Sequence, residues 1–171
     1  MKQFTINRDK HYCKWWWTKL LKPRFGNKKW SVVFLMGSDD WRSTPRNPDD
    51  YDINKLYGVG FGFNHHKNSW RIGWNWDFEK LNTFNIFAYV YDEQDGHISK
   101  LIGKVEGDKA CSITVESTGS KYRFKSNDLG ATVEMPNVNK DCWLQFDLYP
   151  YHGGNNTAPK KETFFIEFKP K

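Results

Sequence analysis

The residues best suited to chemistry stand in one polar turn of the sequence. Residues 64–69 read Asn-His-His-Lys-Asn-Ser, and an arginine follows two positions later. Lysine and arginine bind phosphate or carboxylate oxygens, while histidine, asparagine and serine supply further hydrogen bonds. Function concentrates in such turns because a rigid scaffold fixes their ends. We therefore predict an anion-binding site made of His65, His66, Lys67, Asn68, Ser69 and Arg71.

Two segments with alternating side chains flank this turn and must position it. In 57–63, three glycines at 58, 60 and 62 share one face of a strand, opposite tyrosine, valine and phenylalanine. In 70–76, Arg71, Gly73 and Asn75 lie opposite the tryptophans. The segments predict a hairpin with 65–69 at its exposed end. Three glycines in register indicate that a ligand, or a tryptophan from a neighbouring sheet, approaches the backbone there.

Further aromatic and polar residues are predicted around this glycine-lined face. Alternation in 84–91 places two tyrosines beside Arg71, and alternation in 143–149 turns Gln145, Asp147 and Tyr149 outward. The loop 149–159 contains tandem glycines and asparagines and can fold over a site. Arg71 must meet solvent, a ligand, or a carboxylate such as Asp77, Asp92 or Asp147. Besides the turn, the predicted ligand-binding residues are Asn75, Tyr89, Tyr91, Tyr149, Tyr151 and Asn155.

The sequence predicts neither a metal nor a cofactor. Adjacent residues on a strand point to opposite faces, so His65 and His66 are poorly placed to chelate one ion. The glycine spacing looks like a dinucleotide-binding loop, but these glycines lie inside a strand instead of opening a helix. No catalytic residue is assigned, because neither histidine has a matched acid–base partner in the sequence.

The composition defines the class of fold. The chain of 171 residues contains 13 Phe, 9 Trp and 8 Tyr, which favours strands and excludes disorder. About ten short segments with strand character are separated by turn signals. We predict an all-β protein, an antiparallel β-sandwich of the jelly-roll or concanavalin-like type. One domain is expected over residues 1–171, with a basic and aromatic N-terminal segment at 1–29.

The charge and the cysteines bear on partners and location. A net charge of +6 and a pI near 9.1 favour anionic partners; nucleic acid is compatible but not favoured, and a homo-oligomer is left open. Cys13, Cys111 and Cys142 are an odd, sparse set and are expected to be unpaired. With no apolar run of membrane-spanning length and no signal sequence, a cytoplasmic location away from membranes is predicted.

Three motifs carry a resemblance to a known family. They are 54–58 (Asn-Lys-Leu-Tyr-Gly), 65–74 (His-His-Lys-Asn-Ser-Trp-Arg-Ile-Gly-Trp) and 148–159, with Leu-Tyr-Pro-Tyr, Gly-Gly-Asn and Ala-Pro. From about Tyr51 onwards the chain resembles small β-sandwich proteins, of uncharacterised function, from tailed phages of gut bacteria and from their hosts. The resemblance implies a sandwich fold and, if the chain is phage-encoded, the host cytoplasm. In that family an acidic residue and a histidine often follow Ala-Pro, whereas this chain has Lys160-Lys161-Glu162.

These observations support three hypotheses of function. The first is a non-enzymatic protein that sequesters a small anionic, nucleotide-type ligand, as a phage anti-defence sponge for a nucleotide immune signal would. The second is a carbohydrate-binding β-sandwich module, since tyrosine, tryptophan and asparagine on a flat face also suit sugars. The third is a phosphodiesterase-type enzyme using His65 or His66. Sugar binding does not need Lys67 or Arg71, which separates the first two hypotheses.

Overall fold

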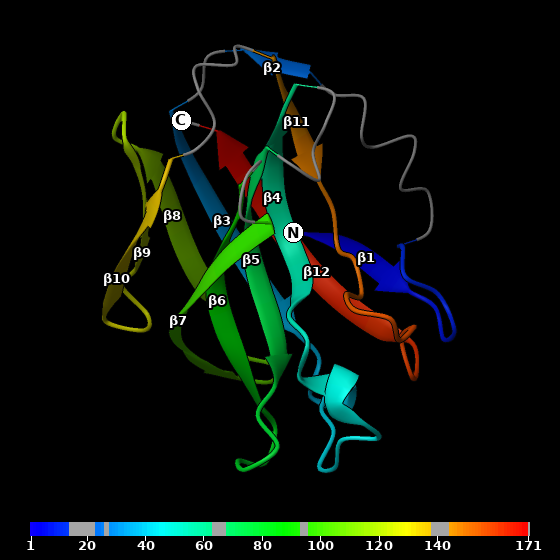
Figure 1. Ribbon diagram of the computed structural model, residues 1–171. Helices are drawn as coiled ribbons and strands as arrows, with labels where there is room; N and C mark the ends of the chain where they lie inside the picture. Colours follow the sequence, from blue (N-terminus) through cyan, green and yellow to red (C-terminus); the bar gives the residue numbers. More distant parts are fainter. Residues whose placement is uncertain (14–22, 26–27, 63–67, 93–95, 138–143, 171) are drawn as a thin grey trace.

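The computed structural model describes residues 1–13, 23–25, 28–62, 68–92, 96–137 and 144–170. In these residues twelve strands pair into two antiparallel sheets of six strands (Figure 1). Sheet A has the order β1 (Lys2–Ile6), β12 (Glu162–Pro170), β3 (Lys29–Met36), β8 (Cys111–Ser117), β9 (Lys121–Ser126), β10 (Ala131–Pro136). Sheet B has the order β2 (Pro23–Phe25), β11 (Leu144–Leu148), β4 (Asn54–Phe61), β5 (Ser69–Trp76), β6 (Thr83–Asp92), β7 (Gly96–Glu106). Two short 3₁₀ helices, η1 (Ser38–Asp40) and η2 (Pro48–Tyr51), lie between β3 and β4.

The core lies between the two sheets and is largely aromatic. Alternate residues of β3 are buried and face the tryptophans and Ile72 of β5, a strand that is buried along its whole length, and the Trp30 and Trp70 rings lie 5.3 Å apart. Trp74 of sheet B likewise lies 5.6 Å from Phe164 of sheet A. Apolar surface from both inner faces is thereby removed from water, which stabilises a sandwich. The predicted all-β antiparallel sandwich is confirmed.

The predicted central hairpin is confirmed as well. β4 and β5 pair antiparallel with Gly60 opposite Ser69, and β6 pairs with β5 on its other side. The strand begins earlier than the predicted segment 57–63, and at Leu56 the register of β4 against β5 shifts by one residue and forms a bulge. This bulge changes which β4 side chains reach the outer face of the sheet.

Two other predictions concern the cysteines and membranes. Cys13 and Cys111 are both buried and are not joined to each other, and the Cys111 thiol lies 3.7 Å from the Ser126 hydroxyl. Cys142 and the Trp15–Trp17 segment lie outside the described residues. Within the described part of the chain, none of the helical segments is long and apolar enough to cross a membrane.

Candidate functional site

The outer face of sheet B, which looks away from sheet A, carries the residues that the sequence placed around the glycines. Arg71 of β5 pairs directly with Gly58 of β4 and with Tyr89 of β6. Directly paired residues share a face, and neither Arg71 nor Tyr89 belongs to the core cluster. Tyr91 pairs with Ser69 and with His97 on the same face. The predicted grouping of Arg71, Tyr89 and Tyr91 is therefore confirmed.

The face of Gly58 is covered by Arg71 itself. A Cβ added to Gly58 would overlap Cδ of Arg71 and the backbone oxygen of Trp70. The atoms nearest to an added Cβ at Gly58 belong to Arg71 and to the Trp70 backbone, while the Trp70 and Trp74 side chains lie in the core on the opposite face. Glycine here lets the arginine side chain lie flat against the neighbouring strand.

The bulge at Leu56 brings a second cation, Lys55, to the same face. Strict alternation would turn Lys55 with Tyr57 toward the core, but Lys55 instead pairs with Gly73. Its Nζ donates a hydrogen bond of 2.6 Å to the Ile53 carbonyl oxygen and lies 4.6 Å from the centre of the Tyr89 ring. Sequence analysis missed Lys55, since a bulge leaves no mark in an alternating pattern.

Both cations are deeply buried, and the charge of Asp52 acts on Lys55 without forming an ion pair with it. Arg71 is 6% exposed and Lys55 is 8% exposed. The Nε of Arg71 has no hydrogen-bond partner in the described part of the chain, and neither side chain forms an ion pair there. Asp77, one expected partner, binds Lys104 at 2.7 Å instead. Burying a charge without a partner is costly, so the pair is an unusual feature to retain.

Burial shifts the proton affinities of both groups. It lowers the pKa of Arg71 to about 10 and the pKa of Lys55 to about 8, and the nearby Arg71 charge contributes to the second shift. Burial, helped by a hydrogen bond with Tyr91, raises the pKa of Tyr89 well above its usual range. Burial also raises the pKa of Tyr151. These phenols remain neutral near pH 7 and do not balance the two cations.

Aromatic side chains form a wall around the cations. The Tyr89 ring lies 5.1 Å from Tyr91 and stacks on His97 at 4.9 Å, with only 8° between the planes. Tyr151 joins them from the loop after β11, because Tyr151 and Lys55 exchange two backbone hydrogen bonds of 2.8 and 2.9 Å. The site thus presents positive charge, ring faces and neutral hydroxyl groups together.

Of the predicted turn, the structure describes Asn68 and Ser69. His65, His66 and Lys67 lie outside the described residues. Asn68 is half-buried, but Ser69 is fully buried, so its prediction as part of an exposed turn is wrong. The reason is that β5 already begins at Ser69 and pairs on both sides.

Asn75 and Asn155 are not brought together with Arg71. Asn75 is buried, donates 2.8 Å to the Tyr51 carbonyl oxygen and accepts 3.0 Å from Asn85, so its amide is used inside the structure. Asn155 is exposed in the loop that follows Tyr151. The role of Asn75 as a ligand-binding group stays a prediction.

The predicted orientation of β11 is also wrong. Gln145 and Asp147 pair with Phe61 and Val59, whose side chains face the core, so both lie on the inner face. Tyr149 also packs inward, with its ring stacked on Phe4 at 5.2 Å.

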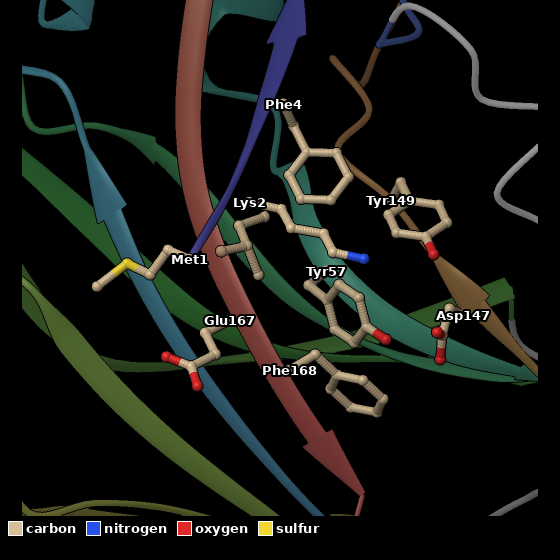
Figure 2. A pocket seen from close by; sticks show the side chains of 9 residues that line it. Met1, Lys2, Phe4, Tyr57, Asp147, Tyr149, Glu167 and Phe168 are labelled. Carbon is tan, nitrogen blue, oxygen red and sulfur yellow. The ribbon is translucent and has the colours of Figure 1, made fainter.

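Asp147 and Tyr149 line a cavity of about 290 Å³ at the edge between the two sheets (Figure 2). Its other lining residues include Lys2, Tyr57 and Glu167. Polar residues can face inward here because the cavity reaches the edge of the sandwich. The cavity is separate from the outer face that carries Arg71.

The β-sandwich is similar to those of alginate lyases of known structure. Alginate lyase AlyC3 matches with a TM-score of 0.59 and 12% identity, over 98% of this chain and 74% of that one. The alginate lyase from Klebsiella pneumoniae gives 0.61 and 8%, over 86% and 61%. Alginate lyase PA1167 from Pseudomonas aeruginosa gives 0.53 and 10%, over 85% of this chain and 65%, just under two thirds, of that one.

These matches identify the fold as a β-sandwich of the jelly-roll type. At such low identities the likeness establishes the fold alone, since one fold hosts many functions. No family model matches the sequence, and no curated protein matches it significantly.

Proposed function

We propose that the protein binds an acidic carbohydrate on the outer face of sheet B. The observation that carries this proposal is the pair Lys55 and Arg71, two cations more than nine-tenths buried without an ion pair among the described residues. An anionic group of a ligand would supply the missing charge. A carboxylate suits the planar guanidinium, which can donate two parallel hydrogen bonds to it.

The aromatic wall favours a sugar acid as the bearer of that carboxylate. Tyr91 and Tyr151 are half-buried, so part of each side chain is accessible to a ligand, and one face of the Tyr151 ring is stacked on His11 at 5.5 Å. Sugars are bound through both kinds of contact, rings against their apolar faces and hydroxyls to their oxygens. The fold adds support, since the similar AlyC3 structure (TM-score 0.58, 12% identity) is described in complex with dimannuronate, an acidic disaccharide.

A nucleotide-type ligand is the second candidate. The same two cations would hold phosphate oxygens, and the rings of Tyr91 and His97 would stack a base. In that case the protein would sequester a nucleotide signal in the host cytoplasm, as the resemblance to phage proteins implies. An acidic sugar presents a carboxylate on a sugar ring, whereas a nucleotide presents a phosphate together with a base. Direct titration with one probe of each kind therefore separates the two candidates.

Isothermal titration of the full chain tests the proposal. The probes are a mannuronate tetrasaccharide, a neutral mannose tetrasaccharide of the same length, and a cyclic dinucleotide. We expect the acidic sugar to bind at least about tenfold more tightly than the neutral one, which is about 1.4 kcal/mol. Equal binding of the two sugars, or binding of the dinucleotide alone, would overturn the proposal.

A further inference from the structure

A chain segment lies across the outer face of sheet B directly beyond Arg71. The Tyr51 carbonyl oxygen accepts a hydrogen bond of 2.8 Å from Asn75. Ile53 lies on Gly73, where an added Cβ would overlap the Ile53 side chain. Along β5 toward its C-terminal end, the sheet face next to Arg71 is therefore already covered by protein.

A second segment covers the face on the side of β4. Tyr151 continues the backbone pairing of Lys55, and the Gly153 amide donates 2.7 Å to Oδ1 of Asn54. A Cβ added to Gly153 would lie 2.7 Å from the Ile53 carbonyl oxygen, so the two covering segments touch. Together they close the Lys55–Arg71 site on two adjoining sides.

The accessible residues lie in the opposite direction. Toward the N-terminal end of β5, Asn68 and Tyr91 are half-buried and His97 is exposed. Among the residues that the structure describes, this is the side on which a ligand can approach the two cations, over Tyr91 and His97. A long saccharide chain that crossed the site would need a second way out, and the segments at Ile53 and Gly153 occupy that path.

We propose that the site takes the terminal residue of an acidic saccharide and not a residue inside a longer chain. This inference rests on the proposed function and narrows its ligand class. The carboxylate of the last sugar would reach Arg71 and Lys55, and the rest of the chain would leave over Tyr91 and His97. Both cations are too deeply buried to be reached by an internal residue of an extended chain.

Stoichiometry tests this inference. Mannuronate chains of 4, 10 and about 40 residues are titrated into the full protein, and the number of protein molecules bound per chain is determined by calorimetry. The inference predicts one protein per chain at every length, with a similar dissociation constant per chain end. A number that rises with chain length would overturn it while leaving the proposed function standing. Absence of binding at every length would instead contradict the proposed function.

Chains blocked at one end give an independent check. One set of tetrasaccharides is modified at the reducing end and a matched set at the non-reducing end. We expect one modification to weaken binding at least tenfold and the other to leave it nearly unchanged. Equal binding of both modified sets and of the unmodified sugar would overturn the inference.

Discussion

The side chain of Arg71 lies against Gly58 on the neighbouring strand, in the space that any other residue at position 58 would need for its Cβ. The guanidinium is thereby held in the plane of the sheet face beside Lys55 and the tyrosines. Gly58 is therefore part of the site although it has no functional group. The space that the Arg71 side chain needs explains why the sequence has a glycine at position 58.

Gly58→Ala is expected to destabilise the protein and weaken binding of the acidic sugar. The new methyl group would overlap the Trp70 carbonyl oxygen as well as Arg71, so β4 and β5 must shift, at a cost of about 1–3 kcal/mol. Urea unfolding and titration with mannuronate tetrasaccharide measure the two effects. Gly103→Ala is the control, because its Cβ would meet the Leu129 side chain, with the nearest atom, Cδ1, at 3.2 Å and with no backbone atom among the nearest contacts. Equal losses in the two variants would contradict this account.

Lys55→Met is expected to stabilise the protein near pH 7. The pKa of Lys55 falls from 10.5 to about 8 on folding, so between these values the unfolded chain binds more protons. The Lys55 contribution therefore makes the free energy of unfolding rise with pH from about 8 to 10.5. Below pH 8 the lysine is charged in both states, and its burial lowers the free energy of unfolding by the full amount. Replacing it should raise the free energy of unfolding by about 1–3 kcal/mol at pH 7, with a smaller gain at pH 9.5.

Urea unfolding at the two pH values checks this prediction. Lys125→Met, at an exposed position on sheet A, serves as the control and should change stability little at either pH. A Lys55→Met protein less stable than the parent at pH 7 would show that the lysine is already compensated in the free protein. The same variant should bind the acidic sugar more weakly despite its higher stability.

Asp40→Asn should also stabilise the protein at neutral pH, for a reason unrelated to the site. Burial raises the pKa of Asp40 from 3.8 to about 6, so between these values the native state binds more protons than the unfolded chain. Its contribution to stability is present below about pH 4 and is lost as the pH rises through 6. We expect a gain of about 1–3 kcal/mol at pH 7 that shrinks toward pH 4.

The amide in Asp40→Asn can still accept the 2.9 Å hydrogen bond from the Thr163 backbone. Thermal unfolding at pH 4 and pH 7 measures the gain, and exposed Asp39→Asn is the control. A gain that is the same at both pH values would exclude titration of Asp40 as its cause.

Alternation in the sequence predicted the central strands of sheet B well. In β5 and β6 the apolar set is continuous, so the face of Arg71, Tyr89 and Tyr91 follows from a period of two. Both strands have neighbours on each side and a fully packed inner face, and this packing fixes their register.

Prediction failed where local irregularity or the sheet edge decides the orientation. The bulge at Leu56 moved Lys55 to the outer face, and a one-residue shift of this kind reverses the face without altering composition. Asp147 of β11 and Tyr149, which follows this strand, face inward because the inner face there opens into the edge cavity shown in Figure 2. Of the two cations in the candidate site, Lys55 could therefore be assigned only from the structure.

The central claim is that Arg71 binds the anionic group of a ligand. The most direct test is titration of mannuronate tetrasaccharide into the parent protein, Arg71→Met and Arg123→Met. Arg123 is the matched control, an exposed arginine on sheet A that pairs with Glu134 at 3.1 Å. We predict that Arg71→Met weakens binding about 10- to 100-fold, or about 1.4–2.7 kcal/mol, without lowering the free energy of unfolding, while Arg123→Met binds like the parent. Unchanged affinity in Arg71→Met, or an equal loss in both variants, would contradict the claim.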